Sequence, residues 1–402
     1  MISRIAPAAA FVLVIACGET PPAAVGTGGS GGSAQGGSIS AGGSAAGTVS
    51  GGQNAGTGGA VTAGAATGGA GAGGTSAGVS GSGGTAGGGS GGTGGGGGAA
   101  GGPSLVQPIM RGELDVLEFG DVYFAVKPGT GARVVSFKLG GDELLTGPNE
   151  HANYYGSTLW TSPADDWVNG PFMPPAAVDN APYTAMVSAD GVITATSASY
   201  TTPKPANAPK QFVVTKSFHA DLAKNAIVID YGLKNTGTAP FQLSHWEVTR
   251  VFTGGMMFFQ TGGAPKLDFL PQLVHTTDAG GYTWWDSTTH MMNQGESKGG
   301  ADSPGGFIAQ VSPHQNGDLL FIKSFKVITK AAAPTGHYPI EFFCNNPHTY
   351  VELEAHSSYD TIAPGATYTA TYTWYLRRLP MGTDRTPGSA ALIAAVKTAL
   401  GK

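Results

Sequence analysis

The sequence predicts an all-β fold for residues 104–402: a large antiparallel β-sandwich with a short C-terminal helix. Three observations predict it. Apolar and polar residues alternate over many short runs, turn-forming Gly, Asn, Asp and Pro separate those runs, and only the last dozen or so residues have helical spacing. Many strands with almost no helix are typical of a large antiparallel sandwich or barrel.

Apolar side chains alternate along four predicted strands, as at Ile227, Ile229, Tyr231 and Leu233. These four strands are predicted over residues 122–126, 135–139, 212–218 and 227–233. Later candidate strands, nearly all separated by turn signals, are 243–252, 256–260, 319–328, 350–355 and 367–377. About a dozen strands in one unit exceed an immunoglobulin-type module. We therefore expect two large curved sheets packed on each other.

The predicted C-terminal helix has a signal at each end. Ser389 can cap its first turn, and Gly401 follows its last residue. Its apolar face is formed by Leu392, Ile393, Val396 and Leu400. The spacing therefore predicts a helix that packs one face on the sandwich.

The chain ahead of the sandwich has a different composition. From Thr20 to Met110 there is no charged and no aromatic residue, and the stretch holds more than half of the 67 glycines. Such a segment cannot bury enough apolar surface to offset the entropy of ordering it. We predict a disordered linker over residues 18–103, with a spacing role, and one folded domain over residues 104–402.

Residues 1–17 are predicted to be a signal peptide, with Arg4 ahead of an uncharged, mostly apolar run. That run is too short to cross a hydrocarbon layer about 30 Å thick. Its end, Val14-Ile15-Ala16-Cys17, resembles a bacterial lipobox, which implies lipidation of Cys17 and a membrane anchor. Gly18, rather than Asp, then favours the outer membrane or cell surface. An ordinary cleaved signal ending at Ala16 is the alternative.

Charge and motif content limit the classes of function. The formal net charge is −5 and the longest basic run is Arg377-Arg378, so we expect no nucleic-acid surface. No zinc spacing, P-loop or dinucleotide fingerprint appears, so we expect no metal and no cofactor.

Cys344 has no partner for a disulfide and is predicted to be a buried small hydrophobe. Ser297, in the pattern GESKG, is predicted to lie in a solvated loop.

Several segments resemble galactose mutarotase-like domains. They are GARVVSFKLGGDELL, IDYGLKNTGTAPFQLSHWEVTRV and YVELEAHSSYDTIAPGATYTATYTWYLRRL. Two further stretches, GSTLWTSPADDW and PPAAVDNAPY, are similar to uncharacterised members of that superfamily. The resemblance covers most of residues 112–380. It implies the supersandwich fold of that superfamily and a concave face suited to carbohydrate.

The resemblance also implies catalytic roles. Mutarotases use a Glu base on the anomeric hydroxyl and a His acid on the ring oxygen, and the matching residues here are Glu352 and His245. Alternation puts His245 and Glu247 on one strand face, and Glu352 and Glu354 on one face of another strand. Burying such groups unpaired is costly, so we expect them in a cleft or in ion pairs.

An ion-paired, purely structural role is the alternative for these acids. Glu247 and Glu352 can pair with cations on neighbouring strands, which are Arg250, Lys323 and Arg377. The sequence also departs from the mutarotase pattern. It lacks their Asn-Arg pair, and Trp160 stands where an earlier His would come. These departures favour recognition of a sugar over catalysis.

Aromatic residues near carboxylates indicate a sugar-binding cleft. Aromatic faces stack on the apolar face of a pyranose, and carboxylates accept hydrogen bonds from its hydroxyls. The predicted binding residues are Trp160, Asp165, Trp167, Asp179, Glu247, Arg250, Trp284, Asp286, Lys323 and Glu354. The pair Asp165-Asp166 is a weak calcium signal, and we expect a solvated loop there.

The function we expect is that of a monomeric, lipid-anchored carbohydrate-binding protein. An active aldose 1-epimerase-like enzyme and a structural cell-envelope protein are the alternatives.

Overall fold

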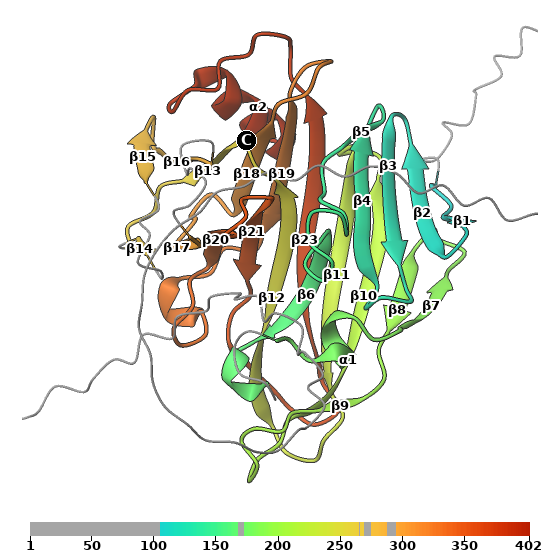
Figure 1. Cartoon of the computed structure of the whole chain (residues 1–402). Helices are drawn as coiled ribbons and strands as arrows, with labels where there is room; N and C mark the ends of the chain where they lie inside the picture. The colour runs from blue at the N-terminus through green and yellow to red at the C-terminus, as the bar shows by residue number, and fades with distance from the viewer. Residues whose placement is uncertain (1–104, 168–172, 265, 269–274, 288–294) are drawn as a thin grey trace, which may run out of the picture. The chain divides into compact units, whose positions relative to one another are not determined.

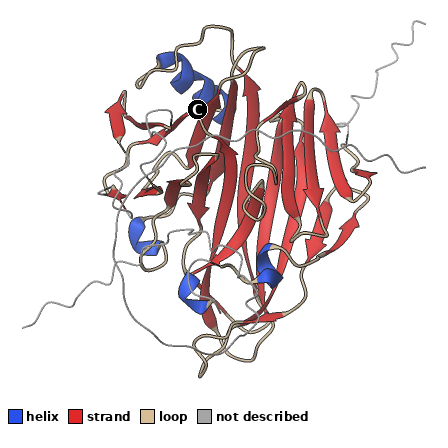
Figure 2. Cartoon of the chain, viewed as in Figure 1, coloured by secondary structure: helices blue, strands red, loops and turns tan. Residues whose placement is uncertain are grey.

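The computed structural model describes residues 105–402, apart from 168–172, 265, 269–274 and 288–294. The predicted signal segment, Cys17 and the linker lie outside the described residues. The described strands form two antiparallel sheets (Figure 1), and the helical segments are few and short (Figure 2). The predicted antiparallel sandwich is therefore confirmed.

The first sheet has 12 strands in the described part of the chain. Its main path runs β1 (Ile109–Arg111), β2 (Leu114–Phe119), β3 (Val122–Lys127), β4 (Arg133–Leu139), β6 (Ser157–Ser162), β12 (Phe241–Phe252), β21 (Tyr350–His356), β20 (Ile340–Cys344), β17 (Ser297–Ala301) and β14 (Leu267–Asp268). Two short strands extend it, β5 (Asp142–Glu143) beside β4 and β22 (Asp360–Ile362) beside β12.

The second sheet has 11 strands by the same count. Its main path runs β15 (Thr276–Ala279), β16 (Tyr282–Asp286), β13 (Met256–Gln260), β18 (Phe307–Ser312), β19 (Leu319–Phe325), β23 (Thr367–Arg378), β11 (Ala226–Asn235), β10 (Gln211–Asp221), β8 (Ile193–Thr196) and β7 (Thr184–Val187). The short strand β9 (Tyr200–Thr201) pairs with β10.

The main core lies between the two sheets, where aromatic rings from both interlock. Phe137 of β4 contacts Phe321 of β19, with ring centroids 6.2 Å apart, and Trp374 of β23, at 5.7 Å. All three are buried. Aromatic side chains of this size remove large apolar areas from water, so this layer supplies much of the driving force for folding.

The helices are few and short in the described residues. The longest, α2 (Ala390–Leu400), starts where Ser389 Oγ accepts a hydrogen bond from the Leu392 amide, at 3.4 Å, and ends at Gly401 in the left-handed conformation. Both end signals are thus confirmed. The others are η1 (Ala164–Asp166), α1 (Ala176–Asp179) and η2 (Lys330–Ala332). No helix in this part of the chain is long and apolar enough to span a membrane.

Central strands of the 12-stranded sheet are covered on both faces. Every residue of β6, β20 and β21 is buried, including charged ones. One face of these strands packs on the core between the sheets. The opposite face, turned away from the 11-stranded sheet, holds the candidate site.

Candidate functional site

The candidate site lies on what we call the outer face, the side of β6, β12, β21 and β20 that points away from the 11-stranded sheet. On the inner side, Leu159, Val251 and Leu353 belong to the main core. Side chains alternate along a strand, so the neighbours of these residues point outward. The outward-facing side chains include Trp160, Trp246, Arg250, Glu352, Glu354 and His356.

Strand register places these side chains in rows. Arg250 of β12 is opposite Glu352 of β21, and Trp246 of β12 lies between Trp160 of β6 and His356 of β21. Directly opposed side chains in a sheet are close enough to interact. The outer face is therefore formed by side chains of neighbouring paired strands rather than by a single loop.

Three tryptophans form one cluster on the outer face. The rings of Trp160 and Trp246 meet edge to face with centroids 5.2 Å apart, and Trp167 stacks on Trp246 at 5.9 Å. Each of the first two donates its indole N–H to a carboxylate: Trp160 to Asp179 Oδ1 at 2.9 Å, and Trp246 to Glu354 Oε2 at 2.6 Å. The aromatic rings and carboxylates are thus held in fixed positions.

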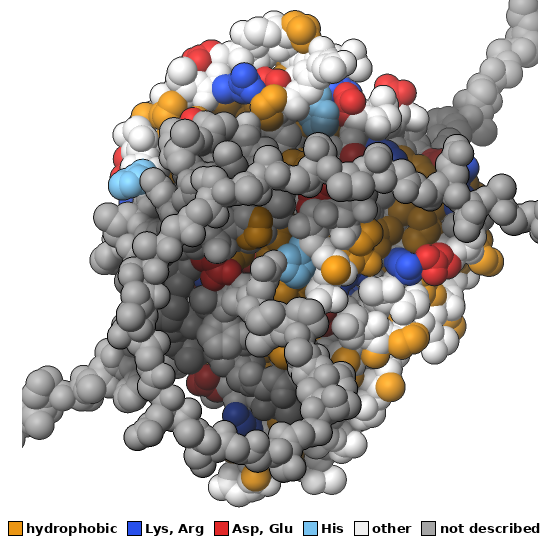
Figure 3. Space-filling view, in the orientation of Figure 1, with side chains coloured by type: hydrophobic (Ala, Val, Ile, Leu, Met, Phe, Trp, Pro, Cys, Tyr) orange, Lys and Arg blue, Asp and Glu red, His pale blue; other side chains and the backbone are white. Residues whose placement is uncertain are grey.

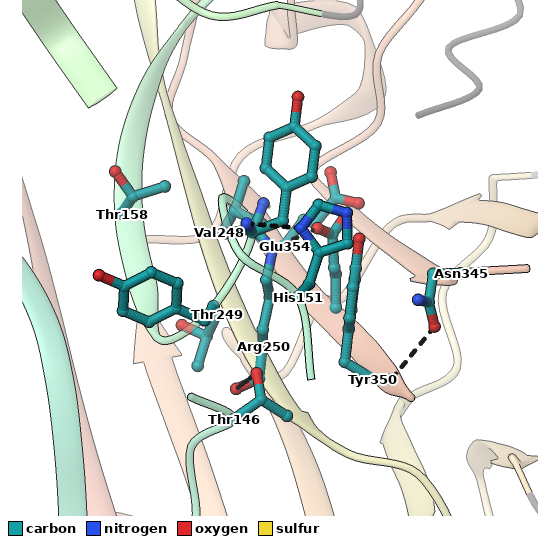
Figure 4. Close-up of polar contacts among 12 residues, drawn as sticks. Thr146, His151, Thr158, Val248, Thr249, Arg250, Asn345, Tyr350 and Glu354 are labelled. Carbon is teal, nitrogen blue, oxygen red and sulfur yellow. Dashed lines mark hydrogen bonds and ion pairs between the residues drawn. The ribbon is translucent and has the colours of Figure 1, made fainter. Parts of the chain in front are cut away.

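Buried ion pairs surround the tryptophan cluster. Arg250 Nε lies 2.7 Å from Glu352 Oε1, and neither side chain is more than 3% exposed. Burial raises the pKa of Glu352 to about 7, although Arg250 opposes the shift. Figure 4 shows Arg250 and Glu354 together with His151 and Tyr350.

Lys298 of β17 forms ion pairs with two glutamates on the same face. Its ammonium lies 2.9 Å from both oxygens of Glu354 and 3.0 Å from Glu341 Oε2. Burial alone would lower the pKa of Lys298, but the two carboxylates raise it above its usual value. Lys298 is therefore charged at neutral pH.

A loop at residues 147–155 forms the rim of the outer face. His151 stacks on Tyr154 with ring centroids 4.8 Å apart, and both are half-buried. Arg133 of β4 holds the loop by donating to the Asn153 carbonyl at 2.6 Å, and it also pairs with Asp179 at 3.0 Å. Where Figure 3 shows coloured atoms on this side of the molecule, acidic, basic and hydrophobic side chains are interspersed.

The two residues that the resemblance assigns to catalysis lie on opposite faces of the 12-stranded sheet. Glu352 is on the outer face, whereas His245 points inward, with Nδ1 3.0 Å from Ser357 Oγ and its ring against Tyr368. Burial lowers the pKa of His245 to about 3. This corrects the expected acid–base pairing, because two groups separated by a sheet cannot flank one sugar ring.

Glu247 and Lys323 also lie on the inner side. They contact each other directly, and both are fully buried. Lys323 also donates to the Leu353 carbonyl at 2.6 Å. The ion-pair alternative therefore holds for Glu247, which pairs with Lys323, and for Glu352, which pairs with Arg250. Arg377 instead donates to backbone carbonyls.

Trp284 and Asp286 lie on β16 of the other sheet and do not join the outer face. Trp284 stacks on Phe258 with ring centroids 4.4 Å apart and donates to the Ala279 carbonyl at 2.9 Å. It belongs to the cluster of apolar side chains beneath α2. Trp284 is thus a core residue rather than part of a cleft.

The adjacent acids Asp165 and Asp166 point to different environments. Asp165 is exposed, whereas Asp166 is buried and lies 2.5 Å from the ammonium of Lys210. Ion pairing with Lys210 already satisfies Asp166. The pair therefore does not present two carboxylates to one calcium ion.

Sequence reasoning missed several residues of the outer face, which are Arg133, Lys298, His337, Glu341 and His356. Alternation along SHWEVTR places Trp246 on the face opposite His245, and alternation along YVELEAH could have found His356. Lys298 lies in GESKG, for which the sequence predicted a solvated loop. That prediction is wrong, because the segment contributes to strand β17 and Ser297 is buried. This segment is a strand because it pairs with β20.

None of the protein-family models matches the chain, and neither does any curated protein. Similar solved structures include a galactose mutarotase-like protein from Lactobacillus casei, at 10% identity over 66% of this chain and 100% of that one, with a TM-score of 0.45. Another, from Clostridium acetobutylicum, has 12% identity over 68% and 99%, with a TM-score of 0.44.

A galactose mutarotase related enzyme from Lactobacillus acidophilus has 10% identity over 66% of this chain and 97% of that one, with a TM-score of 0.42. These three solved structures are thus described as galactose mutarotase-like or mutarotase-related. The two-sheet sandwich itself is defined by the pairing of its own strands.

Proposed function

We propose that the chain is a carbohydrate-binding protein and that the outer face is its binding site. One observation carries the proposal: tryptophans hydrogen-bonded to carboxylates, and three sets of buried ion pairs, lie together on one face of one sheet. Buried ion pairs contribute little net stability compared with apolar packing. Their concentration in one place is typical of a functional site.

The chemistry of the outer face suits a neutral polyol. The indoles and the charged groups beneath are buried, so the half-buried rings of the rim are the parts of this face that can stack on the carbon face of a pyranose. Tyr154 and His151 are the half-buried members nearest the solvent. A sugar would first contact these two rings at the rim.

Binding without turnover is the form of this function that the geometry favours. His245 lies on the inner side of the sheet, and Glu352 is already paired with Arg250 on the outer side. Ring opening needs an acid and a base on either side of one sugar. The outer face therefore supports recognition rather than aldose epimerisation by this residue pair.

A glycan array followed by calorimetry tests the proposal. We expect the full chain to bind a defined set of saccharides, and Tyr154→Ala to weaken that binding about tenfold or more, as loss of a stacked ring does. Tyr123→Ala is the matched control, because Tyr123 is a half-buried tyrosine on β3, away from the tryptophan cluster. No binding to any glycan, or equal loss in both variants, would overturn the proposal.

We also propose that the protein is exported and anchored by a lipid on Cys17. The lipobox-like end of the leader and the uncharged linker after it support this. In a bacterial host, wild-type protein should enter the detergent-rich phase on Triton X-114 partition. Cys17→Ser should move it to the aqueous phase. Equal partition of both forms would contradict the anchor.

A further inference from the structure

Two histidines and a glutamate meet at one end of the outer face. His337 precedes β20, Glu341 lies within β20, and His356 is the last residue of β21. Each is at least nine-tenths buried. The Glu341 Oε1 atom lies 3.0 Å from His337 Nδ1 and 3.6 Å from His356 Nε2.

These distances suit a shared ion. One ligand atom from each residue lies within 4.8 Å of the other two. Ligand atoms about 2.1 Å from a tetrahedral ion are about 3.4 Å from one another. The distance from Glu341 to His337 is shorter than that value and the distance to His356 is longer, so small movements of the two imidazoles bring both distances to it.

A second observation is independent of this spacing. The Nδ1 atom of His356 has no hydrogen-bond partner among the described residues, and Nε2 has only the 3.6 Å contact with Glu341, although the side chain is buried. A buried polar group left unpaired costs about 1–3 kcal/mol. Such groups are rare in folded proteins, and a bound ion or water is a common reason for them.

We propose that His337, Glu341 and His356 bind a divalent transition-metal ion of the zinc type. Two imidazole nitrogens and one carboxylate oxygen are ligands that Zn²⁺ accepts, whereas Ca²⁺ and Mg²⁺ require mostly oxygen ligands. Three protein ligands leave a fourth tetrahedral position for water or a substrate atom. This site goes beyond carbohydrate binding and does not depend on it.

The surroundings hold the three ligands in place. Lys298 contacts the second oxygen of Glu341 at 3.0 Å, and the Tyr338 amide donates to its first oxygen at 3.0 Å. Trp246 lies against both imidazoles, with centroid distances of 4.9 Å to His337 and 5.2 Å to His356. Outer partners of this kind orient metal ligands.

The charges of the cluster are compatible with a dication. Glu341 and Glu354 together carry two negative charges and Lys298 one positive charge. With neutral imidazoles the group has a net charge of −1 before the ion binds. Adding a divalent cation leaves one positive charge, which a metal-bound hydroxide would neutralise.

Zinc binding to untagged, chelator-treated full-length protein tests the site. We expect one Zn²⁺ per chain that depends on this cluster, and a loss of affinity of about 100-fold or more in His356→Ala, since even outer-partner changes cost 10–100-fold. His219→Ala is the matched control, because His219 lies on β10 of the other sheet. This control should bind as the wild type does.

Cobalt substitution keeps the test decisive if the His356 variant does not fold. Wild-type protein loaded with Co²⁺ should show the intense visible bands of a four-coordinate nitrogen and oxygen site, absent from aqueous Co²⁺. The proposal is overturned if the folded wild type takes up neither metal. It is also overturned if a folded His356→Ala protein binds Zn²⁺ as tightly as the wild type.

Discussion

Both carboxylate oxygens of Glu354 lie 2.9 Å from the ammonium nitrogen of Lys298, in a place where neither side chain is more than 3% exposed. The same carboxylate accepts the indole N–H of Trp246. One cation thus fixes an acid and, through it, an aromatic ring. The outer face is organised by its own charges before any ligand arrives.

Removing the cation should leave two buried carboxylates without a counter-charge. We predict that Lys298→Met lowers the free energy of unfolding by about 3–5 kcal/mol, the usual cost of breaking a buried pair. Urea unfolding measures it. The control is Lys224→Met, which breaks the solvent-exposed pair with Asp221 and should cost less than about 1 kcal/mol. Similar losses in the two variants would contradict the electrostatic account.

The turn before β4 tests how closely α1 is packed against it. Gly131 has a φ of +63°, and a Cβ there would lie 1.9 Å from the Asp179 carbonyl oxygen. Gly131→Ala should therefore displace α1 and cost about 3 kcal/mol or more in thermal or urea unfolding. Gly129→Ala meets nothing within 4 Å and should be nearly neutral. A neutral effect at Gly131 would show that α1 is not packed as described.

Sequence reasoning found strands in which apolar and polar residues alternate, even where, as in β21, every residue is buried. β11 alternates over Ile227–Leu233, and its boundaries differ from the prediction by only one or two residues. Some of the strands that it missed, namely β6, β18 and β20, are buried along their whole length. A strand covered on both faces can lack an alternation of apolar and polar residues, as β20 does. Its presence depends on tertiary neighbours that the local sequence does not reveal.

The same limit explains the site. Glu352 and Glu354 could be predicted as face-sharing acids, because alternation is a local property. Which face they share with Arg250, and on which side His245 lies, depends on strand register between distant segments. His337, Glu341 and His356 also come together only through the pairing of β20 and β21. Their spacing in the chain matches no familiar metal motif.

Lys216 should make stability depend on pH. It is fully buried and donates to the Gly131 carbonyl at 2.7 Å, and burial lowers its pKa to about 7. Above that pH the folded protein holds a neutral lysine, while the unfolded chain keeps the proton up to about pH 10.4. The free energy of unfolding should therefore rise with pH above about 7, by at most about 1.4 kcal/mol per unit from this group.

Comparing wild type with Lys216→Met isolates this term. Urea unfolding at about pH 6 and about pH 9 should show a larger gain with pH in the wild type, because the variant lacks the titrating group. Any lost hydrogen bond to Gly131 adds a nearly constant offset. Parallel pH profiles would mean that Lys216 stays charged in the folded protein.

Mutarotation separates the binding function from the enzymatic alternative. We predict that wild-type protein leaves the polarimetric relaxation of freshly dissolved aldoses at the buffer rate, because His245 and Glu352 are on opposite faces of the sheet. Glu352→Gln should give the same rate. A rate enhancement that disappears in Glu352→Gln would instead establish an epimerase.

Hydrogen–deuterium exchange, with and without the saccharide that binds best in the array, tests the central claim most directly. If the outer face is the binding site, added saccharide should slow amide exchange in the 147–155 loop and in β6, β12 and β21. Exchange in β8 and β10 of the other sheet should not change. Protection confined to the other sheet, or no protection anywhere at saturating saccharide, would contradict the account.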